Sequence, residues 1–497
     1  MKRTLSFLLA VLMLLCTLLV SCSTDSDTEG SGGSSSIGVG GETDQYGQPV
    51  LSDGIPEELD YKGAVVNILV RDHISRYGDW TTDEGATDAL SREIYARNIT
   101  VSENLGVTLN FIKSETGTNG ATINNTIYNT YMAGLGGIDI VSNYQHFGTS
   151  PTLLDCYMNL YNEKLTYLDL SKPWWNQNFI SAAESFNRLY LTVGDMNLAV
   201  YKCAFAMYFN ETKCLDYNIT ADELYGLVLD GKWTIEKLQQ YTKNTYQLID
   251  ESNPLNDFYG LDTIFESHAF DGWVAAFDCN LTQTDSAGMH TIIGESELQK
   301  LYDAADLIGA YYATNDVYTR KVYGGEADCI FEDQRSLFGL FAIGEANGFK
   351  DSMTDKYGLL PLPKYNEGQT DYYGGVQDSH DAVSVLAHPQ QNYEMISAVL
   401  EKLNSVSYKS VRPYFIETLV KFRYLQDSQS GQVIDIILKG TRWDFSDIYA
   451  VSTGEIRNNL WRVPLQKGET MSSTVASKKD TMNALLETLD AWLVAHE

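Results

Sequence analysis

Basic residues are scarce in this chain. Its 497 residues include 35 Lys and Arg against 66 Asp and Glu, which gives a formal charge of −31. Such an acidic surface repels phosphate backbones and anionic headgroups. The composition therefore excludes nucleic acid as an expected partner.

Paired cysteines are also lacking. Besides Cys16 and Cys22 near the start, none of the remaining cysteines forms a CxxC pair, and their number is odd; they are Cys156, Cys203, Cys214, Cys279 and Cys329. This spacing indicates neither a zinc site nor a full disulfide framework. We expect small buried core residues instead.

Several catalytic motifs are absent: the sequence has no GxSxG elbow, no Walker loop and no HExxH helix. We therefore predict that the chain is not an enzyme and that it uses no cofactor and no metal. A secreted glycoside hydrolase remains an alternative, because it needs only two carboxylates about 5–10 Å apart. Glu332 with Asp333, or Asp378 with Asp381, could supply them.

The N-terminus has the layout of a secretion signal, in which Lys2 and Arg3 precede an apolar run over 5–20. The following residues, 19–22, resemble the lipobox of bacterial lipoproteins. We predict a signal peptide over 1–21, acylation at Cys22, and a flexible tether over 22–55 that is rich in Ser, Gly, Thr and Asp. The protein would then be lipid-anchored at the cell membrane, facing outward, with no other membrane contact.

The first part of the folded body alternates between strand and helix patterns. Continuous apolar runs predict strands over 64–71, 107–112 and 138–142, and helical spacing predicts helices over 88–105 and 122–135. This order implies right-handed crossovers and a parallel sheet. Ligands bind beyond the carboxyl ends of such strands. The polar loops 71–80 and 143–147 are therefore candidate site segments.

The segment 188–210 is where we expect the chain to leave one lobe and enter another. We predict two strands here, 189–193 and 204–209, joined by a polar elbow that contains Asp195. A second polar elbow, 374–381, contains Asp378 and precedes a strand over 382–387. Two such crossings predict an α/β protein of two lobes, 56–200 with 381–407 and 201–380 with 408–497.

The second lobe carries an aromatic helix face and a polar loop. Phe270, Trp273 and Phe277 share the spacing of one helical face. A strand predicted over 326–331 ends at Glu332 and Asp333. Another strand is predicted over 356–363, and the segments 393–403, 408–425, 432–438 and 478–495 are predicted to be mainly helical.

Together these segments resemble bacterial extracellular solute-binding proteins of the carbohydrate type, the lipid-anchored receptors of ABC importers. The resemblance covers essentially the whole mature chain. Its carriers, besides the lipobox, are SENLGVTL (102–109), GGIDIVSNYQ (136–145), DLSKPWW (169–175), LTVGDMN (191–197), LDGKWTIEKL (229–238) and YGLLPLPKY (357–365). It implies a type II periplasmic-binding-protein-like fold with two α/β lobes, hinge crossovers and a C-terminal helical segment, and sugar as cargo.

Ligand-facing residues follow from the resemblance and from sugar chemistry. The resemblance suggests Asn143, Tyr144 and Gln145 in the first lobe, and Phe270, Trp273, Glu332 and Asp333 in the second. Aromatic rings cover the apolar face of a pyranose, and carboxylates or amides hold its hydroxyls. On this ground Trp80, Asp195 and Asp378 join the predicted ligand-binding set.

The cargo and the partners stay open at this point. The same two-lobe fold could bind a peptide or a polyamine, which an acidic cleft would attract. The resemblance implies that ABC importer permease subunits receive the cargo, and we expect a monomer.

Overall fold

The computed structural model describes residues 51–114, 120–134, 136–264, 268–320, 329–424 and 428–496. These residues belong to one compact unit, Asp44–Glu497. The predicted signal peptide, Cys22 and the tether up to residue 50 lie outside the described residues. Within them, no helix is both long and apolar enough to cross a bilayer.

The first sheet has the strand order β12-β3-β1-β2. Strands β1 (Ala64–Val70), β2 (Val107–Lys113) and β3 (Ile140–Tyr144) run parallel, as predicted. The crossover helices are α3 (Ala89–Leu105) and α4 (Gly120–Ala133). The Asp88 carboxylate caps α3 by accepting from the Ser91 amide, and Gly106 ends it in the left-handed region at φ 59°.

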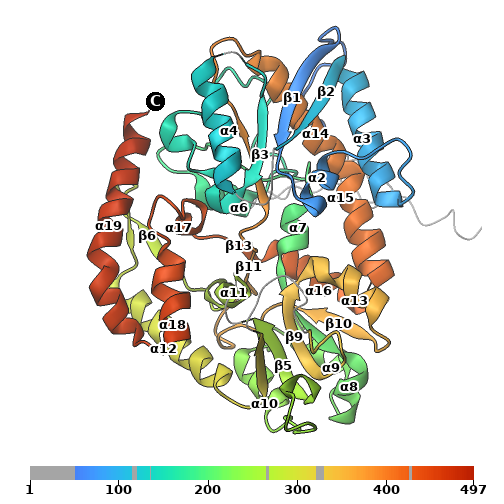
Figure 1. The fold of residues 1–497 in the computed structure, drawn as a ribbon, viewed down its shortest axis with the longest axis vertical. Coiled ribbons are helices and arrows are strands. Elements are labelled where there is room, and N and C mark those ends of the chain that lie inside the picture. Colours follow the sequence, from blue (N-terminus) through green and yellow to red (C-terminus); the bar gives the residue numbers. More distant parts are fainter. Residues whose placement is uncertain are drawn as a thin grey trace, which may run out of the picture. The chain divides into compact units, whose positions relative to one another are not determined.

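A strand from much later in the chain completes this sheet. Strand β12 (Asp381–Val385) pairs antiparallel with β3, with Asp381 opposite Tyr144. It corresponds to the strand predicted after the second elbow. The first lobe is therefore built from two separate stretches of sequence (Figure 1).

The second sheet has the order β10-β4-β9-β5-β8. Its strands are β4 (Phe205–Asn210), β5 (Tyr259–Ile264), β8 (Val317–Arg320), β9 (Ser336–Ala342) and β10 (Tyr357–Leu360). Strands β4, β5, β9 and β10 are buried along their whole length. Around this sheet come α8 (Glu211–Asp216), α9 (Ala221–Leu229), α10 (Ile235–Thr242), α11 (His268–Ala276), α12 (Glu295–Tyr312) and α13 (Ala346–Ser352).

The chain passes between the two sheets along neighbouring segments. On the way out, α7 (Ala199–Cys203) leads into β4; on the way back, β11 (Gly374–Gly375) leads toward β12. Isolated bridges join Thr192 to Val383 and Ala204 to Val376, so the two passages lie side by side. The expected paired crossings are therefore present.

The C-terminal part is mainly helical, as predicted. It comprises α14 (Tyr393–Lys409), α15 (Val411–Pro413), η4 (Tyr414–Tyr424), α16 (Ser428–Lys439), α17 (Phe445–Ile448), η5 (Asn458–Arg462), α18 (Val463–Lys467) and α19 (Met471–Ala495), with the short strand β13 (Thr441–Arg442) between α16 and α17. Helix α14 packs on α3 of the first lobe, whereas α16 packs on β10 and α9 of the second.

Three local predictions were wrong. Residues 189–193 form no strand, since within this stretch only Thr192 makes a bridge, an isolated antiparallel one to Val383 of β12. The predicted strand 326–331 is a turn in its described part, 329–331, and the strand is β9. Part of the predicted polar loop after β1 is the helix α2 (Ile74–Trp80).

Trp174 and Trp175 are neighbours at the end of the DLSKPWW segment. Both side chains are buried. The two indole N–H groups donate to the two carboxylate oxygens of Glu401 on α14, at 2.9 and 3.0 Å. One carboxylate therefore gives both rings the same structural role.

Candidate functional site

A cavity of about 40 Å³ lies where segments of both lobes and of the C-terminal part meet. We call it the interlobe cavity. The first lobe contributes residues of α5 (Gln145–Gly148), and the second contributes residues of β4 and α11. Its full lining is Gln145, His146, Phe205, Asp271, Gly272, Gly375, Val376, Asp378, Arg442, Trp443, Ser446, Asp447, Ala450, Glu455, Ile456, Arg457, Asn458 and Arg462.

His146 joins three segments at this cavity. Its Nδ1 lies 3.2 Å from Oδ2 of Asp378 on the return crossing, and its Nε2 lies 3.0 Å from Oε1 of Glu455 in the C-terminal part. Burial lowers the pKa of His146, but its hydrogen bonds to the two carboxylates outweigh burial and raise the pKa to about 10. The ring is thus a cation at neutral pH.

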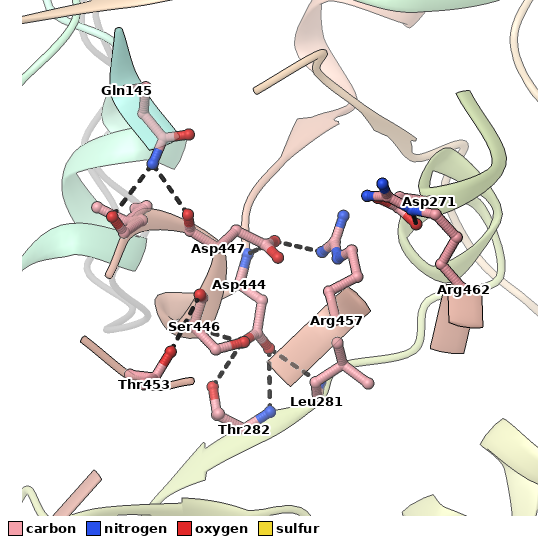
Figure 2. A network of polar contacts seen from close by, with 11 residues as sticks. Gln145, Asp271, Leu281, Thr282, Asp444, Ser446, Asp447, Thr453, Arg457 and Arg462 are labelled. Carbon is pink, nitrogen blue, oxygen red and sulfur yellow. Dashed lines mark hydrogen bonds and ion pairs between the residues drawn. The ribbon is translucent and has the colours of Figure 1, made fainter. Parts of the chain in front are cut away.

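Two arginine–aspartate pairs form another wall (Figure 2). Arg457 pairs with Asp447, and Arg462 pairs with Asp271 of α11. Burial raises the pKa of Asp447 to about 7, although the Arg457 charge opposes that shift. The carboxylates of this wall are therefore already matched by cations.

Helix α17 is fastened to both lobes. The Gln145 side-chain amide donates to the carbonyls of Asp447 and Ile448, at 2.9 and 3.2 Å (Figure 2). On the other side, the Asp444 carboxylate accepts from the Leu281 and Thr282 amides, at 2.9 and 3.1 Å. Separation of the lobes would have to break one of these two sets.

Among the residues that the structure describes, three buried polar atoms of the cavity lining have no hydrogen-bond partner: Oε1 of Gln145, Nε1 of Trp443 and Nε of Arg457. Buried polar atoms are nearly always hydrogen-bonded in folded proteins. One acceptor and two donors therefore remain to be satisfied at the meeting point of the lobes.

The structure brings some of the predicted residues to this place. Gln145 and Asp378 line the cavity. Tyr144 adjoins it, since its hydroxyl donates to Asp378 at 3.3 Å and its ring lies 4.6 Å from the Arg71 guanidinium carbon. Asn143 is buried beside them, and its amide donates to Asn124 at 2.7 Å.

The predicted aromatic rings lie in the core instead. Trp80, Phe270 and Trp273 are each 0% exposed. The Trp80 indole donates to Ser142 at 3.0 Å, and the Trp273 indole donates to the Tyr312 hydroxyl at 2.7 Å. These partners give each indole N–H a structural hydrogen bond.

The other predicted residues lie elsewhere. Glu332 and Asp333 occupy a turn before β9, and the next residue, Gln334, contacts Asp355 near the end of β4. Asp195 lines a different cavity, of about 580 Å³. None of the three residues lines the interlobe cavity.

Sequence inspection missed most of the charged lining. His146 directly follows the predicted Gln145, so extending that loop by one residue would have found it. Trp443, Glu455 and Arg457 lie far along the chain, and Gln145 and Asp447 are 302 residues apart in sequence. No local pattern signals such an approach.

The residues that the structure describes contain no group of three or more His, Cys, Asp or Glu side chains arranged to hold a metal ion.

Sequence comparison alone finds no relative: no protein-family model matches the chain, and no curated protein matches it. Solved structures do match it. The GacH receptor of Streptomyces glaucescens GLA.O, described in complex with acarbose, has 12% identity and a TM-score of 0.53 over 86% of this chain and 99% of its own.

Two further structures have similar statistics. The ABC transporter associated binding protein from B. animalis subsp. lactis Bl-04, in complex with beta-1,6-galactobiose, has 12% identity and a TM-score of 0.54 over 86% of this chain and 98% of its own. The sugar-binding protein MalE from Xanthomonas citri has 11% identity and a TM-score of 0.55 over 87% and 100%. The chain therefore has the two-lobe, type II periplasmic-binding-protein-like fold of these proteins.

Proposed function

We propose that this chain is a lipid-anchored substrate-binding protein that captures a carbohydrate in the interlobe cavity and delivers it to an ABC importer. The observation that carries the proposal is the set of unpartnered polar atoms on Gln145, Trp443 and Arg457, which line one cavity at the meeting point of the lobes. Sugar hydroxyls both donate and accept, so a single ring can satisfy all three. The sugar-binding proteins that share the fold support this choice.

The charge pattern favours a neutral ligand over a polyamine or an acidic peptide. Asp447 and Asp271 are matched by Arg457 and Arg462, and His146 lies between two carboxylates. A polyamine would need carboxylates that are not already paired. Polarised carboxylates and guanidinium groups are also strong hydrogen-bonding partners for hydroxyls.

The size of the cavity implies hinge motion. About 40 Å³ holds little more than water, whereas small-molecule sites occupy about 300–1,000 Å³. Entry of a sugar therefore requires the lobes to separate. The hinge for this motion would be the paired crossings, which are joined by the bridges Thr192–Val383 and Ala204–Val376. A ligand shifts the balance between open and closed forms only by its preference for one of them.

A thermal-shift screen of the purified full chain against oligosaccharides tests the proposal, because a specific ligand raises the melting temperature by mass action. We expect one sugar class to raise it. Gln145→Ala should weaken that sugar's affinity by about tenfold, as expected for a lost hydrogen bond, and Gln240→Ala on the exposed face of α10 should not. No shift with any sugar, or a shift only with spermidine or peptides, would reject carbohydrate as the cargo.

The anchor and the partner belong to the same proposal. Acylation at Cys22 would hold the protein at the outer face of the membrane, and the importer permease would receive the closed, loaded form of a monomer. Labelled palmitate should be incorporated into the wild-type chain and not into Cys22→Ser. Equal labelling of both would place the anchor elsewhere, without bearing on the cargo.

Release of reducing sugar from oligosaccharides would instead indicate a glycoside hydrolase. We expect none after long incubation, because Asp381 of the candidate pair Asp378–Asp381 lies 2.6 Å from the Arg71 guanidinium, and Glu332 and Asp333 lie in a turn outside the interlobe cavity.

A further inference from the structure

A second cavity, of about 580 Å³, shares no lining residue with the interlobe cavity. We call it the crossing cavity, because Asp195 and Tyr201 at the outgoing crossing form one of its walls. The other walls come from residues 173–178, from 412–417 and from 435–439. Its volume falls within the range of about 300–1,000 Å³ that small-molecule sites occupy.

Two buried polar atoms of this lining lack a hydrogen-bond partner in the described part of the chain. Asp195 is 2% exposed; its Oδ1 accepts from the Tyr201 hydroxyl, but its Oδ2 accepts from no donor. Nη1 of Arg412 lies 3.8 Å from that Oδ2, too far for a hydrogen bond, and the Arg412 Nε is also unpartnered. A buried acceptor and a buried donor thus remain unsatisfied on neighbouring side chains.

From this arrangement we propose that the crossing cavity is a second binding site, for a small neutral polyhydroxylated molecule. A hydroxyl group can donate to the Asp195 carboxylate while a second hydroxyl accepts from the Arg412 guanidinium. Apolar residues provide a surface for the C–H face of such a ligand: Pro173, Trp175, Pro413, Ile416 and Leu438.

The charges of the lining disfavour the other ligand classes. An anion bound to Arg412 would also meet Asp195, Glu417 and Asp435, whereas a cation bound to the carboxylates would meet Arg412 and Lys439. A neutral polyol avoids both conflicts. Burial raises the pKa of Asp195 to about 6, and the Arg412 charge and the Tyr201 hydroxyl oppose the shift, so at neutral pH the group is mainly an acceptor.

A ligand in the crossing cavity would contact both lobes. Residues 173–178 are tied to the first lobe through Trp174, Trp175 and Glu401, whereas α16, which carries Leu438, packs on β10 and α9 of the second. Binding here is therefore linked to the relative motion of the lobes, and the linkage acts in both directions between the two sites.

Calorimetric titration of the full chain with D-glucose and with myo-inositol tests the site. We expect saturable binding of at least one of these probes. Leu438→Trp places an indole in the cavity and should weaken that binding by about tenfold or more, as should Asp195→Asn, which removes a charged acceptor. The matched control is Leu248→Trp, at a residue of the second lobe that is 57% exposed and does not line the cavity; it should bind like the wild type.

Several outcomes would overturn the proposal: no saturable heat with either probe, binding that Leu438→Trp leaves intact, or binding of glutamate or spermidine in place of the polyols. If Asp195→Asn does not fold, Leu438→Trp decides alone. The second site does not depend on the interlobe site. Loss of polyol binding in Gln145→Ala, with Leu438→Trp unchanged, would reject the crossing cavity and leave the proposed function standing.

Discussion

The two cavities differ in how closely their acidic and basic side chains are paired and in how much space remains between them. In the interlobe cavity Asp447, Asp271 and Asp378 each have a cationic partner, and only about 40 Å³ remains between the segments. In the crossing cavity the Asp195–Arg412 pair is 3.8 Å apart, and about 580 Å³ remains. The small interlobe cavity is therefore lined by close ion pairs, whereas the larger crossing cavity is lined by a pair that is too far apart to hydrogen-bond.

Among the interlobe pairs, only His146, with Asp378 and Glu455, joins the first lobe to the rest of the chain; Arg457–Asp447 lies within the C-terminal part, and Arg462–Asp271 joins that part to the second lobe. We infer that these pairs hold together the segments around the interlobe cavity. A buried ion pair is weak evidence for stability by itself, because desolvation offsets much of the attraction. Breaking one side of such a pair is costly, however, because the remaining charge stays buried. The predictions below use that asymmetry to test the comparison.

The largest effect is expected from Arg457→Met. It leaves Asp447 without its cation, and because the pKa of Asp447 is about 7 the loss appears where the carboxylate is ionised: we expect about 3 kcal/mol of unfolding free energy at pH 9 and less at pH 7. Urea denaturation of the full chain measures this change. The double variant Arg457→Met with Asp447→Asn should recover most of the loss, because no charge then stays buried. A loss below about 1 kcal/mol in the single variant would mean that this pair does not hold the segments together.

A smaller effect is expected at Glu401, beneath the Trp175 wall of the crossing cavity. Burial raises the pKa of Glu401 from 4.5 to about 7, although hydrogen bonds from both indoles oppose the shift. The folded state therefore binds more protons than the unfolded state between these values, so this group's contribution to stability falls as pH rises from about 4.5 to about 7.

Glu401→Gln should remove that dependence, which amounts to about 2–3 kcal/mol between the two pH values. Urea denaturation at a series of pH values measures the slope for both proteins. Because other groups titrate in the same range, the difference between wild type and variant is the quantity to compare. Parallel curves would show that Glu401 keeps an ordinary pKa in the folded protein.

At pH 9, His146→Gln should cost about 1–2 kcal/mol, because glutamine keeps hydrogen-bonding capacity but loses the charge shared with Asp378 and Glu455. The folded-state pKa of His146 is raised from 6.5 to about 10. Its contribution is therefore fully present below about 6.5 and is lost as pH rises through about 10. The stability difference between wild type and variant should narrow over that range. A difference that stays constant with pH would assign the effect to packing alone.

Sequence patterns predicted the parallel strands and crossover helices of the first sheet well for identifiable reasons. Its strands are continuous apolar runs, and α3 carries both an Asp88 cap and a Gly106 stop. In the second lobe, the apolar residues of 329–331 competed with those of β9, and the tertiary structure placed the earlier stretch in a turn. Two apolar runs separated by a few polar residues cannot be ranked by periodicity alone.

The lining of the interlobe cavity was predicted only at the loop after β3 and at the return elbow. Gln145 and Asp378 come from the loop and the elbow that the topology identified, and both line the interlobe cavity. The aromatic spacing of Phe270 and Trp273 is equally compatible with a core, and that is where the structure places both rings. Arg457 and Trp443 reach the cavity through tertiary folding of the C-terminal part, which leaves no local signal.

The smallest effect is expected at an exposed ion pair, which serves as the control for the interlobe pairs. Lys232 lies 3.2 Å from Asp230, and their side chains are 53% and 65% exposed. Water and salt screen such a pair, so Lys232→Ala should change the unfolding free energy by no more than about 0.5 kcal/mol. Raising the salt concentration should reduce this difference in unfolding free energy further. If urea denaturation instead gave Lys232→Ala and Arg457→Met equal losses, burial would not distinguish the pairs at the interlobe cavity from exposed pairs, and the inference that they hold the segments around the cavity together would fail.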